Sequence, residues 1–157
     1  MKNLNLPNYT FKYKTKEQKK YIYDQIRKKY IKLTPEEWVR QNFLKYLIQE
    51  KKYSPNLMTV EMAFQLNKVK YRADIVSFDK SGAPSLIVEC KAPDIQISQE
   101  HFNQITRYNY ELKVKYLIVT NGIKHYCATI DYTNKTYQFL KSIPDRELVH
   151  SISGDED

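Results

Sequence analysis

Two short runs of the sequence place charged side chains where the pattern otherwise predicts apolar strands. Asp74 lies in the run Arg72-Ala73-Asp74-Ile75-Val76, and Glu89 and Lys91 end the apolar run 86–91. Because strand side chains alternate between the two faces, Glu89 and Lys91 would project from the same side of a sheet. Burying a carboxylate and an ammonium there is costly unless the charges are paired or bind a metal. The residue types and spacing therefore indicate a metal-dependent site that cleaves phosphodiester bonds.

The expected cation is Mg²⁺, which prefers oxygen ligands and usually takes only one or two carboxylates from the protein. Asp74 and Glu89 would supply these carboxylates. A divalent cation activates water as a nucleophile, and Lys91 could orient that water or meet the negative charge that develops on the phosphate. A structural alternative is also open, in which Glu89 and Lys91 pair only with each other and Asp74 merely begins a strand.

Length and composition limit the other classes of protein. The 157 residues suit a single domain over 1–157, with a core over 9–145 and frayed ends at 1–8 and 150–157. The net charge of +8 favours a polyanionic partner, although solubility alone could explain it. The 3 glycines cannot form a Gly-rich phosphate loop. The absence of a signal-like or membrane-spanning apolar run, together with 2 cysteines outside any Cys-x-x-Cys motif, favours a reduced, cytoplasmic protein.

Hydrophobic periodicity predicts the elements that would position the charged residues. The run Thr34-Pro35-Glu36-Glu37 predicts the start of an amphipathic helix that ends before Ser54, with Glu37 closing a capping box. Ser98 predicts the start of a second helix that runs to about Lys113. Strands are expected over residues 57–66, 69–79, 85–91, 116–120, 124–131 and 136–140. A crossover between the strands at 85 and 116 then gives a three-layer mixed α/β domain.

The residues before the first helix allow two interpretations. Aromatic and polar residues alternate over 9–13, and a second aromatic run occupies 21–23, which favours a hairpin across the lysine-rich residues 14–20. A helix through residues 16–30 competes with this hairpin. The chain has 14 tyrosines, several of them beside lysines, and such pairs could grip single-stranded nucleic acid. Tyrosines that serve the core and the sheets are the more common alternative.

The charged motifs resemble those of the PD-(D/E)XK nuclease superfamily. Ala73-Asp74 stands in place of Pro-Asp, and Glu89-Cys90-Lys91 is similar to the E-x-K element. Gln104-x-x-x-Tyr108, which follows the E-x-K strand, resembles the Q-x-x-x-Y motif of the nuclease domain at the N-terminus of type I restriction enzyme R subunits. The similarity covers roughly residues 9–145 and looks like a standalone bacterial version of that domain.

This resemblance implies a three-layer restriction-endonuclease-like fold with a central mixed β-sheet flanked by helices. It implies Mg²⁺-dependent endonuclease-type hydrolysis of DNA phosphodiester bonds, with Mn²⁺ as a substitute. Asp74, Glu89 and the backbone carbonyl of Cys90 would hold the metal, while Lys91 would assist the attacking water. The alternative is a catalytically silent module of the same fold that binds DNA or docks a partner.

Further residues and partners follow from the same resemblance. Gln104 and Tyr108 would support the site or contact DNA, and Arg72 would join them. An additional acid, Glu37 or Glu61, would complete the site, unless Glu37 serves only in the capping box and Glu61 only faces solvent. The expected partners are DNA and either a second copy of the chain, as a homodimer, or a separate restriction-system subunit. No association with a membrane is expected.

Overall fold

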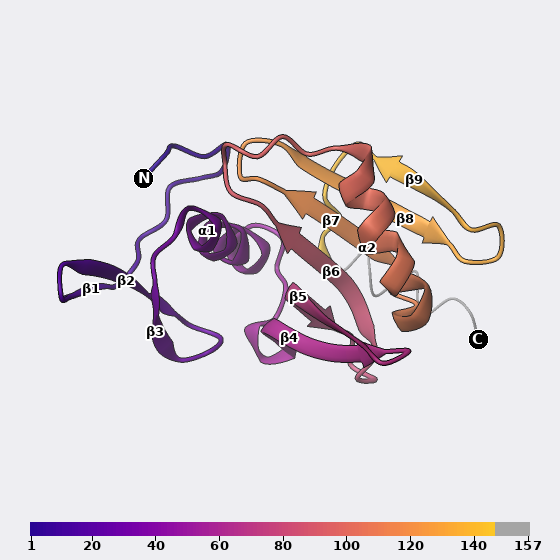
Figure 1. Ribbon diagram of the computed structural model, residues 1–157, viewed down its shortest axis with the longest axis horizontal. Helices are drawn as coiled ribbons and strands as arrows, with labels where there is room; N and C mark the ends of the chain where they lie inside the picture. The colour runs from indigo at the N-terminus through magenta and orange to yellow at the C-terminus, as the bar shows by residue number, and fades with distance from the viewer. Residues whose placement is uncertain (147–157) are drawn as a thin grey trace.

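A six-stranded sheet dominates the computed structural model, which describes residues 1–146 except for the side chains of residues 66, 107, 108 and 111 (Figure 1). The elements in chain order are β1 (Tyr13–Lys16), β2 (Lys19–Asp24), β3 (Lys29–Lys32), α1 (Pro35–Gln49), a 3₁₀ turn (Pro55–Leu57), β4 (Met58–Leu66), β5 (Val69–Phe78), β6 (Pro84–Cys90), α2 (Gln99–Leu112), β7 (Tyr116–Thr120), β8 (His125–Asp131) and β9 (Thr136–Leu140). The predicted strands from residue 57 onward are confirmed to within one or two residues at their ends.

The large sheet is mixed and has the order β4-β5-β6-β7-β8-β9. Strands β6 and β7 are parallel and are joined through α2, whereas the other neighbouring strands are antiparallel. The strands predicted over 57–66 and 69–79 pair as an antiparallel hairpin, in which Asn67 and Lys68 form the turn with positive φ angles of 49° and 66°. This arrangement places the Asp74 strand, β5, directly beside the Glu89 strand, β6.

The two helices begin where the capping residues predict. The Thr34 hydroxyl accepts a hydrogen bond from the Glu37 N–H, and Pro35 occupies the first turn. The Glu37 carboxylate, however, binds arginines, as described below, so the predicted role of its side chain in a capping box is wrong. Helix α2 does have a capping box, formed by Ser98 and His101. Neither helix among residues 1–146 combines the length and hydrophobicity needed to span a membrane.

The hydrophobic core consists of two clusters that share the central strand β6. Val88 packs in the cluster that contains Phe43 of α1. Its neighbour Ile87 packs in the cluster that contains Phe102 of α2. Successive residues of a strand point to opposite faces. Because β6 has apolar residues at consecutive positions, it contributes to both clusters.

The N-terminal residues form a separate three-stranded antiparallel sheet, in the order β1-β2-β3. The predicted hairpin is therefore confirmed, and the competing helix through 16–30 is wrong. Glu17 and Gln18 adopt φ angles of 52° and 64°, which suit a tight two-residue hairpin turn. In Figure 1 this sheet stands beside α1, at the opposite end of the view from β8 and β9.

The first residues pack against the body, although fraying was expected over 1–8. The Asn5 N–H donates to the Gly122 carbonyl over 2.8 Å, and the Trp38 indole donates to the Lys2 carbonyl over 3.0 Å. Leu4 packs against the cluster that contains α1. These contacts order the segment through backbone pairing that the composition of residues 1–8 does not reveal. The predicted fraying at 150–157 lies outside the described residues.

Candidate functional site

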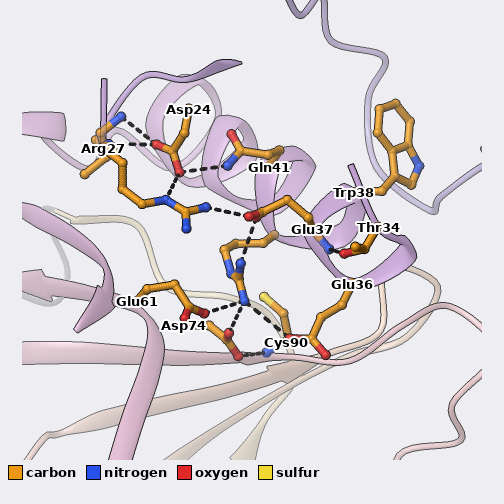
Figure 2. Close-up of polar contacts among 12 residues, drawn as sticks. Asp24, Arg27, Thr34, Glu36, Glu37, Trp38, Gln41, Glu61, Asp74 and Cys90 are labelled. Atoms are coloured by element: carbon orange, nitrogen blue, oxygen red, sulfur yellow. Dashed lines mark hydrogen bonds and ion pairs between the residues drawn. The ribbon is translucent and has the colours of Figure 1, made fainter. Parts of the chain in front are cut away.

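The guanidinium of Arg40, on α1, is the centre of a buried network of charges. Its Nη2 lies 2.6 Å from Asp74 Oδ1, 2.5 Å from Glu61 Oε1 and 3.3 Å from Glu36 Oε1. Its Nη1 donates to Glu37 Oε2 over 2.8 Å. Figure 2 shows these carboxylates converging from one helix and two strands on a single guanidinium group. The arrangement brings Asp74 together with both candidate additional acids.

Helical spacing explains why Arg40 reaches this position. Glu36 and Glu37 precede it by one turn, and Phe43 and Leu44 follow it by one turn on the face that packs against the sheet. The Arg40 side chain is only 7% exposed and extends from the apolar face of α1 toward the sheet. The pKa of Arg40 is raised, because the attraction of Asp74 and Glu37 outweighs the opposing effect of burial. Arg40 is therefore a fixed cation.

Glu61 reaches the network through an unusual backbone conformation. The pairs Val60–Ile75 and Met62–Ala73 flank it in the ladder between β4 and β5, and its own φ is +58°. Such a φ is rare for a residue other than glycine within a strand, and sites of this kind often have a functional role. The prediction that Glu61 is available to the Asp74 site is consistent with this geometry.

Asp24 and Arg27 extend the network toward the N-terminal sheet. Arg27 Nε lies 2.6 Å from Asp24 Oδ2, and Arg27 Nη2 lies 2.6 Å from Glu37 Oε1. Asp24 is fully buried and also accepts a hydrogen bond from Gln41 Nε2 over 2.9 Å. Burial alone would raise the pKa of Asp24, but the hydrogen bonds from Arg27 and Gln41 outweigh it and lower the pKa.

The network carries more negative than positive charge. Its five carboxylates belong to Asp24, Glu36, Glu37, Glu61 and Asp74, and its three guanidinium groups belong to Arg27, Arg40 and Arg72. Five negative and three positive groups leave a charge of −2 when all are ionised. The pKa of Glu36 is raised, first by burial and then by the charge of Asp74, while Arg40 and Lys91 act in the opposite direction. An added cation would relieve this repulsion.

The E-x-K residues lie directly next to this network. Ile75 pairs with Val88, so Asp74 and Glu89 occupy the next positions along β5 and β6. The second Asp74 oxygen, Oδ2, accepts the Cys90 N–H over 2.7 Å. Lys91 Nζ lies 3.8 Å from Glu89 Oε1, which is the pairing that the structural alternative expects. The charges of Asp74 and Glu89 both raise the pKa of the Cys90 thiol, although burial is the largest cause. Asp74 and Glu89 thus lie on neighbouring strands, with Asp74 hydrogen-bonded to the residue that follows Glu89.

The other predicted site residues are Gln104, Tyr108 and Arg72. Gln104 is exposed on α2, and the side chain of Tyr108 lies outside the described part of the chain. Arg72 is 67% exposed, with its Nη1 3.3 Å from Glu61 Oε2. Within residues 1–146, no three or more His, Cys, Asp or Glu side chains are arranged as a ready-made metal site. The carboxylates around Asp74 are instead arranged around Arg40.

Sequence reasoning missed Arg40, Glu36 and the pair of Asp24 and Arg27. The signal for Arg40 is its position between Val39 and Phe43, on the apolar stripe of a helix, where an unpaired arginine would be costly. Two glutamates one turn earlier supply part of the required pairing. Arg27, three residues after Asp24, is a local partner, but the contact of Asp24 with Gln41 spans 17 residues and leaves no local signal.

Comparisons with known proteins identify the family of this chain. A family model described as type I restriction enzyme R protein N terminus matches residues 35–144, which is well over half of the chain. A solved structure described as a fragment of an HsdR subunit of a type I restriction enzyme, from Vibrio vulnificus YJ016, has a fold similar to this one. The TM-score is 0.53 and the identity is 23%, over 72% of this chain and 24% of that chain.

The extent of these matches limits what they show. The chain spans about a quarter of the length of the solved HsdR fragment, and at this identity the likeness concerns the fold. A comparison with curated proteins gave no match. The family match, by contrast, includes α1 and every strand of the large sheet. On this evidence the chain belongs to the family of type I restriction enzyme R protein N-terminal regions.

Proposed function

We propose that this chain hydrolyses DNA phosphodiester bonds with a divalent cation, Mg²⁺ or Mn²⁺, as part of a restriction system. The observation that carries the proposal is the excess of two carboxylates in the ion-pair network around Asp74. In a chain with a net charge of +8, such a local excess of negative charge suits a divalent cation. The family match supports the restriction context.

Each site residue has a role in this proposal. Asp74 and Glu89, with the backbone carbonyl of Cys90, would hold the cation, and Glu61 or Glu37 would add a further oxygen. When bound, the cation supplies charge neutralisation at the phosphate and a lower pKa for an attacking water. Lys91 would hold this water or stabilise the charge that develops on the phosphate.

The surrounding residues orient the acids. The Cys90 N–H holds one oxygen of Asp74, while Arg40 holds the other and keeps Glu37 and Glu61 close by. The oxygen donors of this set fit the preference of Mg²⁺, whereas the buried thiol of Cys90, whose pKa burial raises, does not act as a ligand. Gln104, Tyr108 and Arg72 would contact DNA beside the site.

The proposal includes a three-layer restriction-endonuclease-like arrangement of the PD-(D/E)XK superfamily. The alternation of β6 residues between the α1 cluster and the α2 cluster supports such layering. We place the protein in the cytoplasm. Its partners would be DNA and a protein that supplies a second site, because one site cuts one strand at a time. That protein would be a second copy of the chain or a separate restriction-system subunit.

Cleavage of supercoiled circular DNA in Mg²⁺ or Mn²⁺ tests the proposal. Lys91→Ala should reduce the rate by about 10²–10⁴-fold, the usual contribution of one positioned proton-transfer group. Lys80→Ala is the matched control, since Lys80 is exposed in the turn before β6, and it should cleave at the rate of the original chain. Equal activity in the original chain and the Lys91→Ala variant would refute the assignment of the site.

Titration with Mn²⁺ tests the metal separately from the reaction. The original chain should bind Mn²⁺, and Asp74→Asn, which keeps the shape of the side chain, should bind it at least about tenfold more weakly, as one lost carboxylate predicts. Circular dichroism should show that the variant is folded. Equal binding by both proteins would place the cation elsewhere.

A second candidate function is a catalytically silent module that binds DNA or docks a partner. One observation favours it: both Asp74 oxygens already have partners, in Arg40 and in the Cys90 N–H. In that case DNA binding in EDTA would persist, and no preparation would nick circular DNA with either metal.

A further inference from the structure

The N-terminal sheet carries most of the net charge of the chain. Residues 12–32, which include β1, β2 and β3, contain nine basic and two acidic residues. The basic residues are Lys12, Lys14, Lys16, Lys19, Lys20, Arg27, Lys28, Lys29 and Lys32, and the acidic residues are Glu17 and Asp24. Nine minus two gives +7, whereas the whole chain carries +8. This segment also precedes residues 35–144, so the family match does not account for it.

Strand register sorts this charge onto one face of the sheet. Lys14 pairs with Tyr21, which pairs with Lys32, and Lys16 pairs with Lys19. Paired residues share a face, as do alternate residues along each strand. We call the resulting set the lysine–tyrosine face; its members are Lys14, Lys16, Lys19, Tyr21, Tyr23, Tyr30 and Lys32.

The opposite face of the sheet is turned toward the body. Ile22 and Asp24 alternate with Tyr21 and Tyr23 along β2, and both are fully buried. Asp24 bonds to Arg27 and to Gln41 of α1, which attaches the sheet to the helix. The lysine–tyrosine face therefore points away from α1, and its four lysines are exposed.

The tyrosines of this face support lysines. Lys14 Nζ lies 5.7 Å from the centre of the Tyr30 ring, and Lys12 Nζ lies 5.9 Å from the centre of the Tyr23 ring. The two rings meet edge to face, with their centres 5.2 Å apart. Cation–π contacts of this kind hold the lysine side chains over the rings. The rings are thereby partly covered, which favours contact with phosphates over stacking of bases.

We infer that the lysine–tyrosine face binds the phosphate backbone of duplex DNA without reading its sequence. Alternate residues along a strand are about 6.7 Å apart and neighbouring strands about 4.8 Å apart, so the lysines form a grid that meets several phosphates at once. No carboxylate interrupts the face. The choice of DNA as the polyanion rests on the proposed function, but the binding does not require cleavage.

The same sheet leads toward the candidate site. Asp24 lies at the end of β2, and Arg27 joins it to Glu37 through contacts of 2.6 Å on each side. Glu37 in turn bonds to Arg40, which holds Asp74. A duplex held on the lysine–tyrosine face is thus bound by a sheet that these contacts connect to the acids of the site.

Fluorescence anisotropy with a labelled duplex in EDTA, at several NaCl concentrations, tests this inference. Lys14→Gln/Lys16→Gln/Lys32→Gln should reduce the slope of log affinity against log salt by about 2–3, at about 0.9 per phosphate contact. At 0.1 M salt this corresponds to a loss of affinity of at least about tenfold. Lys80→Gln/Lys124→Gln/Lys141→Gln removes the same charge from exposed positions elsewhere and should weaken binding less than about threefold.

The outcomes separate this inference from the proposed hydrolysis. Equal losses in the two triple variants, or no loss in the first, would overturn it, because net charge alone would then explain binding. Tighter binding of a single strand or of duplex RNA of the same length would overturn the choice of ligand. Binding that depends on these lysines without any cleavage in Mg²⁺ would support the surface and refute the hydrolase.

Discussion

Replacing Arg40 by methionine should destabilise the fold more than any change to an exposed arginine. Methionine keeps much of the apolar stem but removes the guanidinium. Its two buried partners, Asp74 and Glu37, have side chains that are 7% and 4% exposed, and Glu37 retains Arg27. Among the described residues, Asp74 would then keep a buried charge with one hydrogen bond, from the Cys90 N–H.

The size of the effect follows from the burial of each partner. Removing one member of a buried ion pair costs about 3–5 kcal/mol, because an uncompensated charge remains. Glu36 and Glu61 are 48% and 23% exposed, so their pairs with Arg40 add at most about 1 kcal/mol each. We expect Arg40→Met to lower the free energy of unfolding by about 3–5 kcal/mol, a large share of the ~5–15 kcal/mol typical of a domain.

Urea unfolding of a double-mutant cycle measures this effect. Asp74→Asn removes the orphaned charge, so Arg40→Met/Asp74→Asn should be less destabilised than the sum of the single variants, by about 0.5–3 kcal/mol. Arg72→Met is the matched control and should cost less than about 1 kcal/mol, since Arg72 is 67% exposed. A cost below about 1 kcal/mol for Arg40→Met, or strict additivity in the cycle, would refute the reasoning.

Three further predictions concern other parts of the fold. Asp24→Asn should cost about 1.5–3 kcal/mol at neutral pH, as expected for hydrogen bonds to a charged group. The pKa of Asp24 is lowered in the folded state, so its ionised carboxylate stabilises the fold at pH values above the ordinary carboxyl pKa. The difference in free energy of unfolding between the two proteins should therefore shrink as the pH of the urea titration falls below about 4. A difference that grows in acid would contradict this prediction. Gly122→Ala should cost about 1–2 kcal/mol, because φ is +84° and the added Cβ would lie 2.7 Å from Leu4 Cδ2. Adding Leu4→Ala to this variant should relieve the clash but not the backbone strain. Full recovery of the melting temperature in the double variant would exclude backbone strain. Cys127 should resist iodoacetamide in the native protein and react in urea, since burial raises the pKa of its thiol to about 12; rapid native labelling of Cys127, detected by mass spectrometry, would show that this strand opens.

Local signals in the sequence account for most of the elements. The Thr34 cap, the polar break between the strands at 57–66 and 69–79, and the short strand expected over 136–140 each agree with a boundary in the structure. These features depend on neighbours within a few residues, where propensity and turn geometry act directly. The competing helix through 16–30 failed because Glu17 and Gln18 form a turn, and strand pairing then satisfies the backbone on both sides.

The candidate site was less predictable, because its contacts span the chain. Asp74 and Glu89 could be placed on neighbouring strands from the hairpin pattern alone. The pairing of Asp74 with Arg40 could not, since the two residues are 34 positions apart and meet only when α1 packs on the sheet. The capping-box interpretation of Glu37 failed for the same reason: two arginines compete for its carboxylate, and a charged partner binds more strongly than a backbone N–H.

Arg40 also links the question of stability to the question of function. If a divalent cation binds among the carboxylates around Asp74, it competes with the guanidinium for the same oxygen atoms. Removing the guanidinium changes the charge of the network from −2 to −3, so Mn²⁺ should stabilise Arg40→Met against urea more than it stabilises the original chain. A purely structural network would give no stabilisation of the original chain by Mn²⁺, because Arg40 already neutralises the carboxylates there. The response of the original chain, compared with that of Arg40→Met, therefore distinguishes a network that only holds α1 to the sheet from one that also holds a metal.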